Sequence, residues 1–213
     1  MKIKLFFVIS VFLILNISTV AVAEMKTFVR DYTYQASEAD SKQSCRIIAT
    51  EQVKRLLLEE IGTYLESHTE VVNYQLSKDQ ITTLTAGVVK TKILDERWDG
   101  EKYWMKAKID ADPDEVAKDI QKLRADRKKV KELQEARKKT DDTMNDMDEM
   151  RKGMESDKDN KEKIDQYNEK VQSLKMIQGM ADSFKALQTG NPDQAMGTMF
   201  NMMGTMIQEA PEK

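Results

Sequence analysis

Methionine is the residue whose abundance and spacing in this sequence could support chemistry. The chain of 213 residues holds 14 methionines, several of them three residues apart near the C-terminus. Thioether sulfurs are soft ligands that suit Cu(I), and the candidate copper ligands are Met196, Met199, Met203 and Met206. The same spacing arises wherever methionines fill one apolar stripe of a helix. Packing between helices is therefore the preferred interpretation, and we expect no metal and no cofactor.

Other residues that could take part in catalysis are few and far apart in the sequence. His68 is the only histidine and Cys45 the only cysteine, and the sequence has neither a Gly-x-Ser-x-Gly turn nor a glycine-rich phosphate loop. The acidic pair at residues 141–142 lacks the glycine-containing loop of a calcium site. Cys45 is predicted to be a small buried residue on a helix, with pairing between chains as the alternative. We therefore expect no enzyme activity.

The first 23 residues have the composition of a secretory signal peptide. Lys2 and Lys4 precede an apolar run, and small residues at 21–23 fit cleavage before Glu24. The alternative is an uncleaved anchor, since residues 5–23 are nearly long enough to span a bilayer. Cleavage removes two lysines, which takes the net charge from −3 to −5. The sequence thus predicts an exported, periplasmic protein of a Gram-negative-type envelope, with no nucleic-acid partner and no transmembrane segment after cleavage.

The mature chain is predicted to have an α+β fold. Residues 26–37 are rich in β-branched and aromatic side chains and predict a strand, whereas residues 37–67 carry an apolar stripe typical of a long helix that starts near Ser37 and Asp40. Ser77 and Asp112 are predicted to begin further helices. We expect a small antiparallel sheet packed by one long helix at 24–112, an antiparallel helical hairpin or coiled coil at 113–190, and a short Met- and Gly-rich helix and tail at 191–213.

Residues 90–110 are predicted to form a β-hairpin around an Asp-Gly pair. A two-residue turn would pair Trp98 with Glu101, whereas a three-residue loop would pair Arg97 with Glu101 and gather the apolar side chains on one face. Burial of one face fixes register, so we predict the second pairing. The apolar face then carries Tyr103, Met105, Ala107 and Ile109. The lysine-rich face, which includes Glu96, is a tentative partner surface with Leu94, Trp98 and Trp104.

Two segments carry a family resemblance. One is the alanine-punctuated helix "ASEADSKQSCRIIATEQVKRLLLEEIGTYLES", and the other is the hairpin "AGVVKTKILDERWDGEKYWMKAKIDAD" with its G-x-x-Y-x-x-x-A-x-I strand. Over residues 36–112 the chain resembles the N-terminal domain of the flagellar assembly protein T and the related LPP20 lipoprotein group. The resemblance implies a small domain with a helix laid on an antiparallel sheet, an envelope location and no enzyme activity.

These observations predict a non-enzymatic exported envelope protein with a structural or assembly role. Its partner would be itself or another envelope protein, because the thin apolar stripe of residues 113–190 suits the pairing of helices more than a wide core. The alternative function is periplasmic Cu(I) binding through the Met-x-x-Met clusters.

Overall fold

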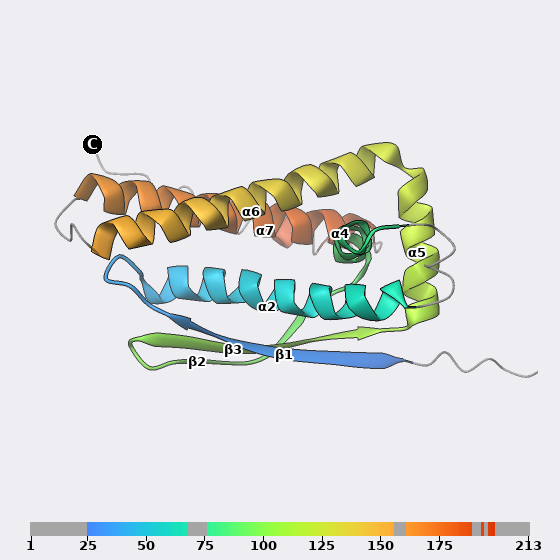
Figure 1. The fold of residues 1–213 in the computed structure, drawn as a ribbon, viewed down its shortest axis with the longest axis horizontal. Helices are drawn as coiled ribbons and strands as arrows, with labels where there is room; N and C mark the ends of the chain where they lie inside the picture. The colour runs from blue at the N-terminus through green and yellow to red at the C-terminus, as the bar shows by residue number, and fades with distance from the viewer. Residues whose placement is uncertain (1–24, 68–75, 156–160, 189–192, 194–195, 199–213) are drawn as a thin grey trace, which may run out of the picture.

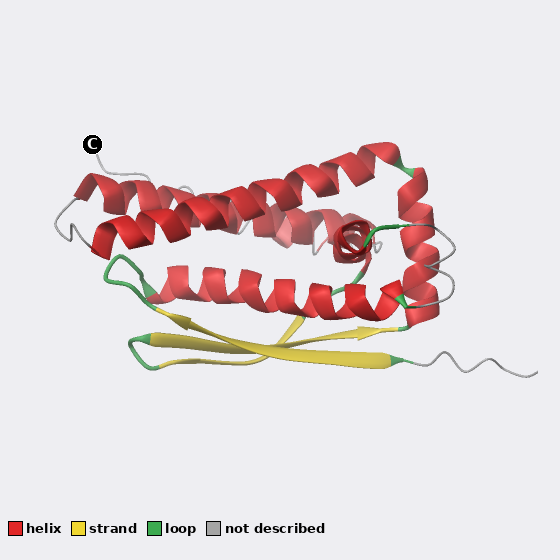
Figure 2. Ribbon diagram, in the orientation of Figure 1, coloured by secondary structure: helices red, strands yellow, loops and turns green. Residues whose placement is uncertain are grey.

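The computed structural model describes residues 25–67, 76–155, 161–188, 193 and 196–198. The strands form one antiparallel sheet in the order β1–β3–β2. Helix α2 packs on one face of this sheet, and α4, α6 and α7 lie on the far side of α2, while α5 crosses one end (Figures 1 and 2). This arrangement confirms the predicted α+β fold with a long helical extension. In chain order the elements are β1 (Lys26–Gln35), α2 (Lys42–Glu66), α4 (Lys78–Val88), β2 (Lys92–Trp98), β3 (Lys102–Ala111), α5 (Pro113–Ala125), α6 (Arg127–Glu155) and α7 (Lys161–Gln188).

The predicted signal peptide, His68 and most of the predicted tail at 191–213 lie outside the described residues. Within the described ranges, no helix combines the length and the apolar character needed to cross a membrane.

Side-chain caps determine where α2 begins. The Ser41 hydroxyl accepts a 3.0 Å hydrogen bond from the Ser44 N–H, and the Ser44 hydroxyl accepts a 2.9 Å bond from the Ser41 N–H. The helix therefore starts after Ser41, later than the predicted start. Ser37 and Asp40 are instead bonded to each other just before the helix, since the Ser37 N–H and O–H both donate to Asp40 Oδ2. Ser77 caps α4 with a capping box, as predicted.

The predicted hairpin of residues 113–190 implies one continuous first helix from residue 113, but that helix is interrupted at Asp126. Asp112 caps α5 and Pro113 is its first residue, as predicted, but α5 ends at Ala125. Asp126 has φ −92° and ψ 86°, and its Oδ1 accepts a 3.1 Å hydrogen bond from the Lys129 N–H. This side chain caps the start of α6. The prediction of one continuous helix was therefore wrong here, and the corner lets α6 run back over α2 (Figure 1).

One hydrophobic cluster joins the sheet, α2 and the helical extension. The predicted boundary after residue 112 falls between β3 and α5, and buried side chains from both sides of it belong to this cluster. Met144 and Met147 of α6 are buried in it, so these methionines pack between helices. Among the fully buried side chains are Val53, Leu57, Ile61, Met105, Ile109, Tyr167 and Leu174.

The β2–β3 turn is built by Asp99 and Gly100. Asp99 Oδ1 accepts hydrogen bonds from the N–H groups of Glu101 (2.9 Å) and Lys102 (2.7 Å), and the Asp99 N–H donates to the Lys102 carbonyl at 3.3 Å. Gly100 has φ 104°, a left-handed conformation that glycine adopts without strain. The turn residues are therefore Gly100 and Glu101, and the predicted loop over residues 98–100 was wrong.

The register of β2 follows from this turn and from a bulge. Trp98 lies opposite Tyr103, rather than Arg97 opposite Glu101 as predicted. Leu94 has no cross-strand partner, and beyond it Ile93 lies opposite Ala107. The bulge shifts the alternation by one residue, which returns Ile93 to the helix side. The four β3 residues predicted to face the core are all buried: Tyr103, Met105, Ala107 and Ile109.

Candidate interaction surface

The sheet has one face packed by α2 and one face directed to solvent. Along β3 the odd-numbered residues from Tyr103 to Ala111 are buried, while the even-numbered ones are exposed or half-buried. No described element covers the even-numbered side (Figures 1 and 2). We call this side the open face. By strand pairing it comprises Thr27, Val29, Asp31, Thr33, Gln35, Lys92, Asp95, Arg97, Lys102, Trp104, Lys106, Lys108 and Asp110.

Trp104 is the aromatic residue of the open face. It lies on the central strand, between Thr33 of β1 and Arg97 of β2. Its indole N–H donates a 3.1 Å hydrogen bond to Asp31 Oδ2, and the Arg97 guanidinium lies 5.0 Å from the ring centroid. These contacts hold the half-buried ring in place. A positioned aromatic side chain of this kind is a common anchor of protein interfaces.

Basic residues outnumber acidic ones on the open face. Five lysine and arginine residues and three aspartates share it, although the whole chain carries a formal net charge of −3. Hydrogen bonds from Lys108 and Thr27 lower the pKa of Asp110 to about 2, so this carboxylate is ionised at pH 7, and its ion pair with Lys108 offsets its charge. Lys102 and Lys106 are exposed. The open face therefore presents cationic groups around a tryptophan.

The three residues predicted for a partner surface occupy different positions. Trp104 belongs to the open face, and Leu94 is 48% exposed at the bulge of the edge strand. Trp98 lies on the helix side, where its ring centroid is 6.0 Å from that of Tyr103 and the side chain packs against the core. The structure therefore leaves Leu94 and Trp104 accessible to solvent and separates Trp98 from Trp104.

Glu96 was predicted for the lysine-rich face and lies on the opposite side. It is paired with Met105, and its Oε2 accepts hydrogen bonds from the Tyr103 hydroxyl (2.9 Å) and from Arg46 Nε (2.8 Å). Burial opposes ionisation of Glu96, but the hydrogen bonds from Arg46 and Tyr103 hold its pKa below the usual range. Because Arg46 belongs to α2, this ion pair fixes the edge strand to the helix.

A polar cluster around Asp40 joins the helical extension to the sheet. The Asp40 carboxylate accepts hydrogen bonds from the hydroxyls of Tyr167 (2.8 Å), Tyr34 (3.0 Å), Ser37 (2.7 Å) and Ser44 (3.0 Å). Burial raises the pKa of Tyr34 to about 12 and also raises the pKa of Tyr167, so both phenols are neutral donors. This Asp40 cluster has the geometry of a structural link between layers. Sequence reasoning had taken Asp40 only as part of a helix start.

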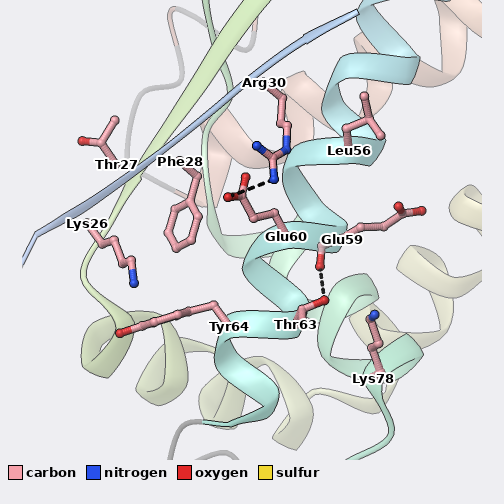
Figure 3. Close-up of a pocket in the computed structure, with 10 residues that line it drawn as sticks. All are labelled: Lys26, Thr27, Phe28, Arg30, Leu56, Glu59, Glu60, Thr63, Tyr64 and Lys78. Carbon is pink, nitrogen blue, oxygen red and sulfur yellow. Dashed lines mark hydrogen bonds and ion pairs between the residues drawn. The ribbon is translucent and has the colours of Figure 1, made fainter.

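A hollow of about 570 Å³ lies between β1 and the C-terminal half of α2 (Figure 3). Inside it Arg30 Nη2 pairs with Glu60 Oε1 at 3.2 Å, and Lys26 Nζ lies 3.5 Å from the centroid of the Tyr64 ring. Glu60 Oε2 is buried without a hydrogen-bond partner in the described part of the chain, and the neighbouring Arg30 offsets its charge. In this hollow Arg30 and Glu60 are paired with each other and Lys26 contacts the Tyr64 ring, whereas the open face is broader and carries an anchored tryptophan.

Of the four candidate copper ligands, Met196 alone falls among the described residues, and it is 67% exposed. Met199, Met203 and Met206 lie outside them. In the described ranges no three or more His, Cys, Asp and Glu side chains are grouped to hold a metal ion.

Comparisons with protein-family models, with curated proteins and with solved structures found no match to this chain. A functional proposal therefore rests on the open face and on the family resemblance of residues 36–112.

Proposed function

We propose that this protein is a non-enzymatic component of the cell envelope that binds a protein partner through the open face. It is exported by its signal peptide, and its role is structural or in assembly. The partner is a second copy of the chain or another envelope protein.

The observation that carries this proposal is the asymmetry of the sheet. Its inner face is buried by α2, but its outer face presents Trp104 among basic side chains, with no described element over it. Large aromatic and arginine side chains are the usual energetic centres of protein interfaces. The resemblance to an envelope family without enzyme activity supports the same conclusion.

Site-specific photo-crosslinking in the source cells tests this proposal. A photoreactive amino acid is placed at Thr33 or Lys106 on the open face, and at Lys118 on the exposed side of α5 as a control. We expect a discrete crosslinked protein from the two open-face positions and none from the control. Equal labelling from all three positions, or none from the open face, would count against the proposal.

A further inference from the structure

We infer that the open face binds the acidic outer surface of the α6–α7 hairpin of a second copy, so that copies associate head to tail. This inference rests on the proposed function and names its partner.

The outer surface of the hairpin carries acidic side chains at helical spacing between Asp142 and Glu169, and exposed lysines (Lys138, Lys152 and Lys161) flank them. On each helix they recur at steps of three and four residues, so they form a stripe along its exposed side. Lys170 of α7 pairs with Asp146 of α6, which places the two stripes next to each other. We call these residues the acidic stripes: Asp142, Asp146 and Glu149 of α6, and Glu162, Asp165 and Glu169 of α7.

The open face and the acidic stripes lie on opposite sides of the molecule but near the same end. Figure 1 shows the sheet as the outermost layer on one side and the hairpin as the outermost layer on the other. Arg151 Nη1, near the end of α6, donates a 3.4 Å hydrogen bond to the carbonyl of Gln35, and Gln35 lies opposite Lys102. The acidic end of the hairpin therefore lies above the Trp104 end of the sheet. If a second copy is translated along the direction in which the sheet, α2 and the hairpin are stacked, its open face meets the acidic stripes of the first copy.

The two surfaces also suit each other in shape. The helices of the hairpin and the strands of the sheet run along the same long axis of the molecule (Figure 1). Strand β3 has 10 residues, which corresponds to a length of about 33 Å. The inner face of the same sheet already accommodates a helix, α2, along this direction. A helix pair on the open face would repeat that packing, with lysines of the sheet facing carboxylates.

Such a contact uses two different surfaces of each copy. It is therefore heterologous, and a pair of bound copies still offers one free open face and one free pair of acidic stripes. This property separates the inference from a symmetric dimer and provides its test.

The test uses two variants of the chain that starts at residue 24. Lys102→Glu/Lys106→Glu reverses charge on the open face, and Glu149→Lys/Asp165→Lys reverses it on the acidic stripes. All four side chains are exposed, so both variants should fold. Lys118→Glu/Lys122→Glu on α5 has the same charge change as the open-face variant and serves as the control. Circular dichroism verifies the fold, and sedimentation velocity measures association.

We expect the wild-type chain and the control to associate as concentration rises, less so at high salt. Each of the two test variants should associate at least roughly tenfold more weakly. An equimolar mixture of the two should associate again, because the intact open face of one variant meets the intact acidic stripes of the other and the two reversed surfaces are also complementary in charge.

Two results would overturn the inference. One is a mixture that stays monomeric while the wild type associates, and the other is a wild-type chain that is monomeric throughout. In either case a different protein crosslinked at Thr33 or Lys106 would leave the proposed function standing, whereas the absence of any such crosslink would remove both.

Discussion

Tyr167 of α7 donates a 2.8 Å hydrogen bond to Asp40, which precedes it by 127 residues. The tyrosine is 1% exposed, and the aspartate lies at the start of α2. This bond, together with those from Tyr34, Ser37 and Ser44, attaches the helical hairpin to the sheet-and-helix unit. The hairpin that carries the acidic stripes is thereby held in a defined position relative to the open face.

Replacing Tyr167 with phenylalanine keeps the ring but removes this donor and the 3.4 Å hydrogen bond between the Tyr167 and Tyr34 hydroxyls. Hydrogen bonds to charged groups contribute about 1.5–3 kcal/mol, so we expect the free energy of unfolding to fall by roughly that amount. Urea denaturation measures it. Tyr32→Phe is a matched control, because Tyr32 is half-buried and its hydroxyl forms no hydrogen bond within the described part of the chain. Equal stabilities for the two variants would show that the bond contributes nothing.

Gly62 permits the close approach of α2 and α4. A Cβ added at this position would overlap the Thr82 hydroxyl oxygen, next to the backbone of α4. We expect Gly62→Ala to destabilise the protein by about 1–3 kcal/mol through overpacking. The control is Gly153→Ala on α6, where the space is open, and this change should stabilise the helix by up to about 1 kcal/mol. Thermal unfolding measures both effects, and a shift of the midpoint in the same direction for the two substitutions would contradict the prediction.

Lys185 makes stability depend on pH in the alkaline range. Burial, with Lys54 nearby, lowers its pKa from 10.5 to about 8, and its Nζ donates to the Ala86 carbonyl at 3.1 Å. Between these two values the unfolded chain binds more protons at this site than the folded chain, so stability rises with pH. Between pH 7 and pH 10.5, the free energy of unfolding of the wild type should rise by roughly 2–3 kcal/mol relative to that of Lys185→Met. A pH-independent difference between the two proteins would contradict this.

Cys45 should resist thiol reagents in the folded protein. The side chain is 0% exposed on α2, as the sequence predicted, and burial together with Asp40 raises the pKa of the thiol to about 12. A thiolate is the reactive form, so labelling by a disulfide reagent should wait for unfolding. Rapid labelling of the native protein, or a dimer lost on reduction, would instead support the alternative of pairing between chains.

The alternation of apolar and polar residues along β3 was enough to predict both faces of the sheet. Its pleat places every second side chain on the same side, whatever β3 is paired with. The register of β2 could not be predicted in this way. The Asp99 side chain moves the turn toward Glu101, and the bulge at Leu94 then compensates, so two local shifts leave Ile93 on the side expected for it.

The Asp40 cluster and the position of Glu96 could not be predicted from the sequence, for a different reason. Each depends on a partner that is remote in the chain: Tyr167 for Asp40, and Arg46 for Glu96. Periodicity describes one element at a time and carries no information about which elements meet. The corner at Asp126 did have a local signal, since aspartate is a common cap, but the charged residues on both sides continue a helical pattern.

The fluorescence of Trp104 in a Trp98→Phe background tests most directly whether the open face is the contact surface. Trp104 is then the only tryptophan, and Trp98 lies on the other side of the sheet. As the protein concentration is raised through the range where sedimentation shows association, we predict that quenching of Trp104 by acrylamide decreases and that high salt restores it. Association with unchanged quenching would show that the copies meet elsewhere and would contradict the role assigned to the open face.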